Sequence, residues 1–268
     1  MTKLHTQQAS QKPKVIFVCG MRRSGNHAFI NWLSNALEEQ QVEYTFDDKF
    51  SYLKFSKSGK TAFINDINRI RPWKRYRMFF TRALTLRKVV TLIVSAEDVN
   101  SNYGQHFQLP FWLPRIQHRI FIKRSILNTI ASRLQHLKKS AAAGKGNRNL
   151  SITTKFFKKL KSWESASSDF VNWEYDLWLT SDSYRQKFLS QLGLKQDILP
   201  TISKEGGGSS FTGRDRTPTK KEATSRFKYI NIPSNIRQDL MQCNIDTMLN
   251  PDEIAHLNTP LEESTAVS

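Results

Sequence analysis

The segment Gly20-Met-Arg-Arg-Ser-Gly-Asn-His27 combines residue types that could bind an anion. A loop between a strand and a helix directs backbone N–H groups at one point, and the helix dipole adds positive potential there. The two glycines let the backbone bend and approach an anion closely. We therefore expect a phosphate group to bind this loop. The residues expected to contact it are Arg22, Arg23, Ser24, Gly25, Asn26 and His27.

The loop differs from the nucleotide triphosphatase pattern GxxxxGK[ST] in its last two positions. Gly20 and Gly25 have the required spacing, but Asn26 and His27 stand where that pattern has lysine and a hydroxyl residue. The lysine that reaches the terminal phosphates and the hydroxyl that holds magnesium are both missing. Magnesium-dependent kinase or triphosphatase chemistry is therefore disfavoured, and a tight turn without a ligand is the simpler alternative.

A second polar pattern begins where a predicted strand, residues 119–123, ends at Arg124. Ser132 follows eight residues later in the next predicted helix. Ser125, Asn128 and Ser132 are spaced i, i+3, i+7, so they form one polar stripe near the start of that helix. The stripe could hold a second anion, or it could be a capping serine followed by an ordinary surface.

A glycine-rich segment at 206–216 contains Phe211, Arg214 and Arg216. Its basic and aromatic residues favour a binding loop, and a flexible linker is the alternative.

Together these segments resemble the cytosolic and bacterial sulfotransferases. That family carries Arg/Lys-Ser-Gly-Thr-Thr at the first loop, where it holds the 5′-phosphosulfate of 3′-phosphoadenosine 5′-phosphosulfate (PAPS). Arg23-Ser24-Gly25 matches, and Asn26 and His27 replace the two threonines.

The family's second signature is an arginine at a strand end and a serine eight residues later, which bind the 3′-phosphate. Arg124 and Ser132 match it, and Arg214 lies in the counterpart of the late loop that closes over the nucleotide. The resemblance covers residues 14 to 216. It implies transfer of a sulfuryl group from PAPS to a hydroxyl or amine, with release of adenosine 3′,5′-bisphosphate (PAP).

Sulfuryl transfer also needs a general base for the acceptor's proton. The family places a histidine before Leu-Pro after a central strand, and here His106 precedes Leu109-Pro110 with two extra residues between. Glu97 and Asp98 follow the same strand and are alternatives, because the carboxyl end of a parallel strand faces the ligand crevice. His27 suits phosphate contact better. His106 and Glu97 are the two candidates for the general base, and Asp98 is a less favoured third candidate.

The hydrophobic pattern predicts strands alternating with helices, hence a three-layer α/β/α fold with a mostly parallel, doubly wound sheet. Loops are expected at 99–115 and 195–222. The predicted organisation is a flexible tail over 1–12, one domain over 13–250 and a C-terminal tail over 251–268. The predicted strands span 14–19, 61–65, 89–95, 119–123 and 169–174, and the predicted helices include 153–166, 181–192 and 233–248.

Charge gives a second interpretation. With 41 Lys and Arg against 23 Asp and Glu, the 268-residue chain has a net charge of +18, which attracts anions. Residues 67–96 and 99–163 contain no acidic residue. A non-catalytic module that binds glycan, nucleic acid or a membrane surface is therefore the alternative. Its aromatic residues would be Trp73, Tyr76, Phe156 and Phe157.

No recognised nucleic-acid motif is present, so nucleic acid is not the expected partner. For the enzyme, the basic surface suggests an acidic carbohydrate as one acceptor.

Cysteine and hydropathy patterns bear on location and metal binding. Cys19 and Cys243 form neither a disulfide framework nor a metal-ligand cluster, so no metal is expected. The first 14 residues lack an apolar signal-peptide core, and no apolar run approaches the length of a membrane span. These features predict a cytoplasmic protein.

Overall fold

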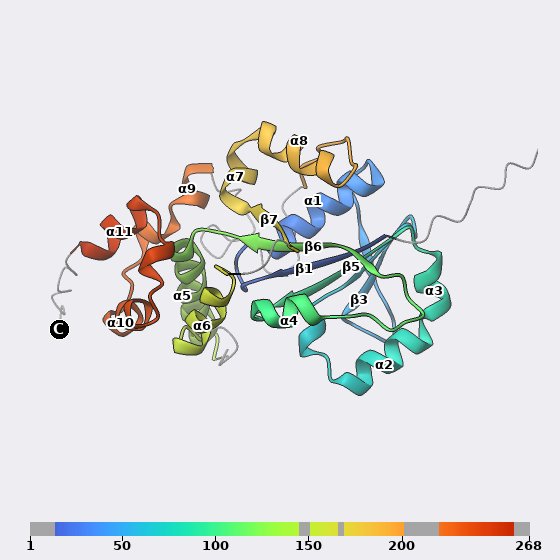
Figure 1. Ribbon diagram of the computed structural model, residues 1–268, viewed down its shortest axis with the longest axis horizontal. Coiled ribbons are helices and arrows are strands. Elements are labelled where there is room, and N and C mark those ends of the chain that lie inside the picture. Colours follow the sequence, from blue (N-terminus) through green and yellow to red (C-terminus); the bar gives the residue numbers. More distant parts are fainter. Residues whose placement is uncertain (1–13, 145–150, 166–168, 201–219, 260–268) are drawn as a thin grey trace, which may run out of the picture.

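The computed structural model describes residues 14–144, 151–165, 169–200 and 220–259 of the chain. Within these ranges seven strands form one sheet in the order β2-β3-β4-β5-β1-β6-β7 (Figure 1). The five strands from β4 to β7 in that order run parallel, and β2 and β3 extend the sheet antiparallel beyond β4. The strands are β1 (Lys14–Gly20), β2 (Tyr44–Phe46), β3 (Leu53–Ser56), β4 (Thr61–Ile64), β5 (Thr91–Glu97), β6 (Ile116–Lys123) and β7 (Val171–Glu174).

The apolar runs of β1 and β5 explain their central position. Val15 to Gly20 are buried, and in β5 only the last residue, Glu97, is partly exposed. Strands that are apolar on both faces must be covered by helices on both sides. The sequence therefore places these two strands in the middle of a layered sheet.

One face of the sheet is covered by α1 (Asn26–Glu38), α7 (Tyr175–Thr180) and α8 (Asp182–Gln191) (Figure 1). Trp32 and Phe188 pack there with Trp173 of β7. The other face is covered by α2 (Pro72–Thr81), α3 (Ala83–Lys88), α4 (Ser101–His106) and part of α6 (Thr154–Ser162).

A third apolar cluster lies beyond the carboxyl ends of β1 and β6. It joins α5 (Ile126–Ala142) and α6 to the C-terminal helices, and Met21 of the loop between β1 and α1 belongs to it. The remaining elements are α9 (Lys220–Thr224), α10 (Ser234–Gln242), α11 (Pro251–Asn258) and the 3-10 turns η1 (Ile67–Arg69), η4 (Arg226–Tyr229) and η5 (Asp246–Met248).

The structure confirms the predicted α/β/α class and the mostly parallel sheet, and every predicted strand overlaps an observed one. The loop predicted over 99–115 is wrong in part. Residues 101–106 form α4, which Asn100 caps by accepting a hydrogen bond from the Tyr103 N–H.

The C-terminal boundaries also need correction. The helix predicted over 233–248 ends at Gln242, because Asn244 takes a positive φ of 51°. The tail predicted from 251 is wrong over 251–258, where α11 forms. Its capping box links Asn250 and Glu253, and the buried Leu257 anchors the helix in the third cluster. The predicted tail over 1–12 and residues 260–268 lie outside the described ranges.

Candidate anion-binding site

The loop between β1 and α1 is a tight turn that depends on positive φ angles. Ser24 closes it by donating its N–H to the Met21 carbonyl at 3.0 Å, and its hydroxyl donates to the same carbonyl at 2.5 Å. Arg23 has φ 71° and Gly25 has φ 109°. A Cβ atom on Gly25 would lie 2.3 Å from the Tyr175 ring, so glycine is required by both backbone angle and space.

Arg22 points to a group of carboxylates at the ends of β4 and β5. Its Nε donates to Glu97 at 3.1 Å, and its guanidinium forms an ion pair with Asp66. Its backbone N–H donates to Asp98 at 2.9 Å. Burial alone would lower the pKa of Arg22, but these three carboxylates outweigh it and raise the pKa. Arg22 therefore anchors the loop to the sheet.

Glu97 connects the same group to the start of α1. One carboxylate oxygen accepts from Asn26 Nδ2 at 2.6 Å and the other accepts from Arg22. The Glu97 backbone N–H donates to Asp66 at 3.2 Å. Burial, together with the neighbouring Glu97 charge, raises the pKa of Asp66. Sequence reasoning missed Asp66, since nothing local to residue 66 indicates its partner.

Arg23 points the other way, into a group of positive charges. Its Nε donates to Ser132 at 3.2 Å, and Arg124 donates to the Arg23 carbonyl at 2.8 Å. Burial and the charge of Arg124 lower the pKa of Arg23. The pattern read from the sequence, an arginine at a strand end and a serine eight residues later, thus meets the phosphate loop at this point.

Arg226 of η4 joins this group and was not found from the sequence. Burial, followed by the charge of Arg124, lowers the pKa of Arg226 to about 10. Arg124 also donates to the Ala223 carbonyl at 3.0 Å, and its guanidinium lies 4.5 Å from the centroid of the Tyr175 ring. Three arginines from separate elements therefore repel one another inside the protein, which is the arrangement expected where a polyanion binds.

Asp176 of α7 interacts electrostatically with Arg124 and Arg226. It accepts from the Ser125 N–H at 2.9 Å, and burial raises the pKa of Asp176. We use the name arginine cluster for Arg23, Arg124 and Arg226.

The other predicted site residues are placed as follows. Ser24 and Asn26 are buried, and Ser24 donates to Asn26 Oδ1 at 3.2 Å, so both side chains hold the loop together. His27 lies half-buried in the first turn of α1. Arg214 lies outside the described residues.

The two candidate bases occupy different positions. Phe107, directly after α4, stacks on Phe17 in the middle of β1 at 4.5 Å between ring centroids. His106 is exposed at the end of α4, whereas Glu97 contacts the loop directly. Asp98 is paired with Arg133, which is buried.

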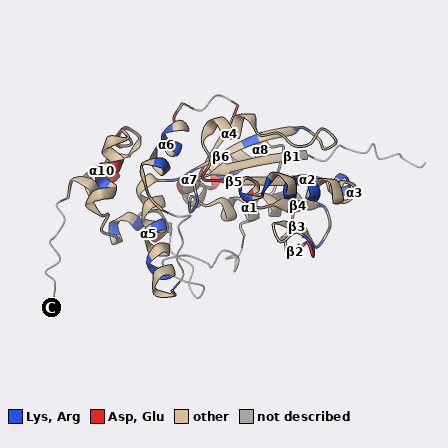
Figure 2. Ribbon diagram, turned by 90° about the horizontal axis from the view of Figure 1, so that it is seen from below, with Lys and Arg blue, Asp and Glu red and all other residues tan. Residues whose placement is uncertain are grey.

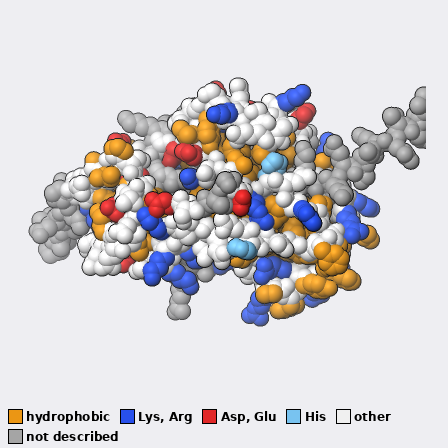
Figure 3. All heavy atoms as spheres, viewed as in Figure 1, with side chains coloured by type: hydrophobic (Ala, Val, Ile, Leu, Met, Phe, Trp, Pro, Cys, Tyr) orange, Lys and Arg blue, Asp and Glu red, His pale blue; other side chains and the backbone are white. Residues whose placement is uncertain are grey.

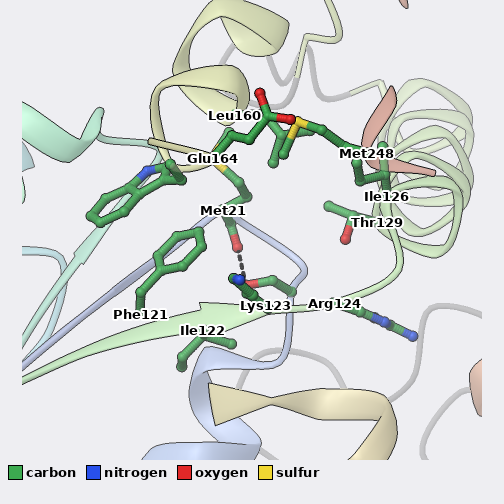
Figure 4. A pocket seen from close by; sticks show the side chains of 12 residues that line it. Met21, Phe121, Ile122, Lys123, Arg124, Ile126, Thr129, Leu160, Glu164 and Met248 are labelled. Atoms are coloured by element: carbon green, nitrogen blue, oxygen red, sulfur yellow. Dashed lines mark hydrogen bonds between the residues drawn. The ribbon is translucent and has the colours of Figure 1, made fainter. Parts of the chain in front are cut away.

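A cavity of about 300 Å³ adjoins the loop (Figure 4). Its walls are mainly apolar, with Lys123, Arg124 and Glu164 adding charge. The side chains come from the loop, β6, α5, α6 and η5, and Phe121 and Trp163 stack in one wall at 4.0 Å. The space is large enough for a flat ring or a short chain beside the phosphate loop.

Among the described residues, no group of three or more histidine, cysteine or acidic side chains could hold a metal ion. In the same ranges no helix is long and apolar enough to cross a bilayer.

Comparisons with known proteins yield structural similarity only. No family model matches the sequence, and no curated protein matches it. A sulfotransferase domain from the Synechococcus PCC 7002 olefin synthase is similar at 11% identity and a TM-score of 0.49, over 90% of this chain and 96% of that one.

Mouse sulfotransferase SULT7A1, solved in complex with PAP, is similar at 13% identity and a TM-score of 0.46, over 91% of this chain and 88% of that one. A sulfotransferase domain from the curacin biosynthetic pathway is similar at 9% identity and a TM-score of 0.46, over 89% of this chain and 98% of that one. The similarity concerns the fold.

Proposed function

We propose that this protein is a sulfotransferase that transfers a sulfuryl group from PAPS to a hydroxyl or amine. The observation that carries the proposal is the meeting of two anion-binding features. The loop after β1 makes a tight turn into the N-terminus of α1, and the arginine cluster lies directly beside it. A nucleotide with separate 5′ and 3′ phosphate groups needs two adjacent sites of this kind.

The residues fit such a donor. Arg23 and the backbone N–H groups in the first turn of α1 would contact the 5′-phosphosulfate, and Arg124, Ser132 and Arg226 would contact the 3′-phosphate. The buried Nε of Arg124 has no hydrogen-bond partner among the described residues, and a phosphate oxygen would provide one. Burial, and after it repulsion between the arginines, lowers the pKa values of Arg23 and Arg226, and a dianionic group would relieve that repulsion.

The chemistry follows from these positions. The bond between sulfur and the 5′-phosphate oxygen breaks as the acceptor atom bonds to sulfur, and the leaving PAP gains negative charge. Positive groups that are fixed beforehand stabilise that charge. A base takes the acceptor's proton. Glu97 is the better placed of the two predicted bases, because it lies at the loop and each carboxylate oxygen keeps one lone pair free.

The acceptor and the location are also predictions. The excess of basic residues favours an acidic carbohydrate as acceptor. Figure 2 shows Lys and Arg distributed over α2, α5 and α6. Two cysteines without a disulfide between them, Cys19 and Cys243, fit a cytoplasmic protein.

The proposal is tested by thermal unfolding with PAP, with ATP plus magnesium, and with 5′-AMP. A ligand at 100 times its Kd stabilises a fold by about 2.7 kcal/mol, which raises Tm by several degrees at this size. We expect this rise with PAP alone, and its loss in Arg124→Ala. Lys187→Ala on the exposed face of α8 is the matched control and should keep it.

A rise with ATP plus magnesium but none with PAP would contradict the proposal and favour a kinase. Stabilisation by heparin alone would favour the non-catalytic binding module.

A further inference from the structure

Helix α2 has apolar side chains on two opposite faces. Met78 and Phe79 are buried in the core beneath the sheet. Trp73, Tyr76 and Phe80, spaced i, i+3, i+7, form a second stripe that faces solvent, with exposed fractions of 56%, 59% and 69%. A surface helix normally has one apolar face and a polar one opposite. The second stripe therefore needs an explanation outside the core.

The stripe extends into neighbouring segments. Leu84 of α3 continues it with an exposed fraction of 75%. Tyr76 packs edge-on against Trp112 at 5.8 Å, and Trp112 packs against Phe111, which is 93% exposed. We call this surface the aromatic face, formed by Trp73, Tyr76, Phe80, Leu84 and Phe111. Figure 3 shows hydrophobic side chains gathered with Lys and Arg at its lower right, over α2 and α3.

Basic side chains surround the aromatic face. Residues 67–96 hold eight Lys and Arg and no acidic residue. Arg71, Lys74, Arg77 and Lys88 are exposed. Lys74 lies 5.5 Å from the centroid of the Trp73 ring. Two members of this range form ion pairs, Arg82 with Asp47 and Asp48 and Arg69 with Asp66. The face is thus both apolar and positively charged.

We propose that the aromatic face binds an anionic membrane surface. Interfacial helices combine Trp, Phe and Leu on one side with Lys and Arg that reach the headgroups, which is the composition found here. Indole and phenol rings prefer the headgroup level of a bilayer. The proposal concerns a surface separate from the arginine cluster, and it does not depend on the sulfotransferase activity.

Two other partners fit less well. A second copy of the chain would bring two positively charged faces together, since residues 67–96 supply no acidic side chain. A single-stranded nucleic acid needs aromatic platforms along a groove on which bases stack. Here the side chains project from the outer side of a helix, and the aliphatic Leu84 offers no ring for stacking.

The test measures co-sedimentation of the full chain with phosphatidylcholine vesicles, with and without phosphatidylserine. We expect binding to the vesicles that contain phosphatidylserine, weakened by salt. The double variant Trp73→Ala/Phe80→Ala should lower the partition coefficient by about tenfold or more. Lys74→Glu/Arg77→Glu should lower it by about 25-fold or more, because two basic residues near the surface each contribute about a fivefold factor.

Matched controls lie on the other side of the molecule. Tyr229→Ala/Met241→Ala removes exposed apolar side chains from η4 and α10, and Lys187→Glu reverses an exposed charge on α8. Both should keep wild-type partitioning. All variants should unfold at the wild-type temperature, because the changed side chains are exposed.

Three results would overturn the proposal. One is partitioning that the aromatic variants leave unchanged. Another is binding to single-stranded DNA that exceeds vesicle binding and falls in the same variants. The third is a dimer in sedimentation velocity that Trp73→Ala/Phe80→Ala dissociates. The PAP-induced rise in Tm, measured in parallel on the aromatic variants, reports the donor site separately and should remain.

Discussion

Arg22 and Arg23 are neighbours in one loop but lie in opposite electrostatic environments. Arg22 is surrounded by Asp66, Glu97 and Asp98, and its pKa is raised. Arg23 faces Arg124, and its pKa is lowered. The positive φ of Arg23 turns the chain between the two sides. The loop thus separates an acidic side, which fixes it to the sheet, from a cationic side, which is left for a ligand.

The contrast shows that residue type alone does not assign a role within a binding loop. Both arginines were predicted to contact the donor, and the structure shows Arg22 already paired with carboxylates. Our proposal therefore assigns stability to Arg22 and binding to Arg23, and the two roles can be separated by experiment.

The largest expected effect is on stability. Arg22→Met leaves three mostly buried carboxylates without their shared cation, and breaking a buried pair in this way costs about 3–5 kcal/mol. Urea denaturation should show this loss in the free energy of unfolding. Arg23→Met is the control, and it should unfold at or slightly above the wild-type midpoint because it relieves repulsion. Equal losses of unfolding free energy in Arg22→Met and Arg23→Met would contradict the different roles assigned to the two arginines.

The next effect is on binding. Arg23→Met should weaken PAP binding by about 10- to 100-fold, because a hydrogen bond to a charged group contributes about 1.5–3 kcal/mol. Isothermal titration calorimetry gives the Kd directly. Unchanged affinity in this variant would show that the cationic side of the loop does not contact the nucleotide.

A smaller effect on stability is expected at Glu97, although removal of the proposed base should also lower the rate of sulfuryl transfer by about 100-fold or more. Glu97→Gln keeps the shape of the side chain but weakens its bonds to Asn26 and Arg22, so we expect a loss of about 1–2 kcal/mol in unfolding free energy. PAP affinity should be retained, because Glu97 lies on the acidic side. A large loss of PAP binding would mean that the two sides are coupled through Asn26.

The smallest expected effect is a change in the pKa of His136 in α5. Burial, the charge of Arg23 and that of Lys139 lower the pKa of His136. A dianionic ligand on Arg23 offsets part of that charge, so PAP should raise the pKa of His136. The imidazolium form would then persist to higher pH. A titration of the histidine Cε1 proton by NMR measures this shift, and Arg23→Met should raise the pKa without ligand.

Local patterns made part of this site predictable. The glycine loop follows an apolar strand, and Arg124 and Ser132 are separated by a fixed spacing, so both could be found by position. The pairing of Arg22 with Asp66 could not be predicted from local patterns, because it depends on β4 lying beside β5. The approach of Arg226 to Arg124 depends likewise on how η4 packs against α5.

Helix α11 and the position of His106 differ in how far the sequence could have predicted them. The capping box of Asn250 and Glu253 is readable in the sequence, so α11 could have been predicted. The position of His106 could not have been predicted from the sequence, because it depends on the direction in which the chain runs from β5 into α4. The packing of Phe107 on Phe17 sets that direction.

The central position of β1 has a consequence for how the protein is made. β1 is the first described strand to leave the ribosome, yet its parallel partners are residues 91–97 of β5 and 116–122 of β6. Contacts between distant segments form slowly, because a long loop must close before they provide stabilisation. An apolar strand therefore waits unpaired until more than a hundred residues have been synthesised. During that interval the nascent chain has to be kept from aggregating, and the phosphate loop acquires its shape only when β5 and β6 arrive.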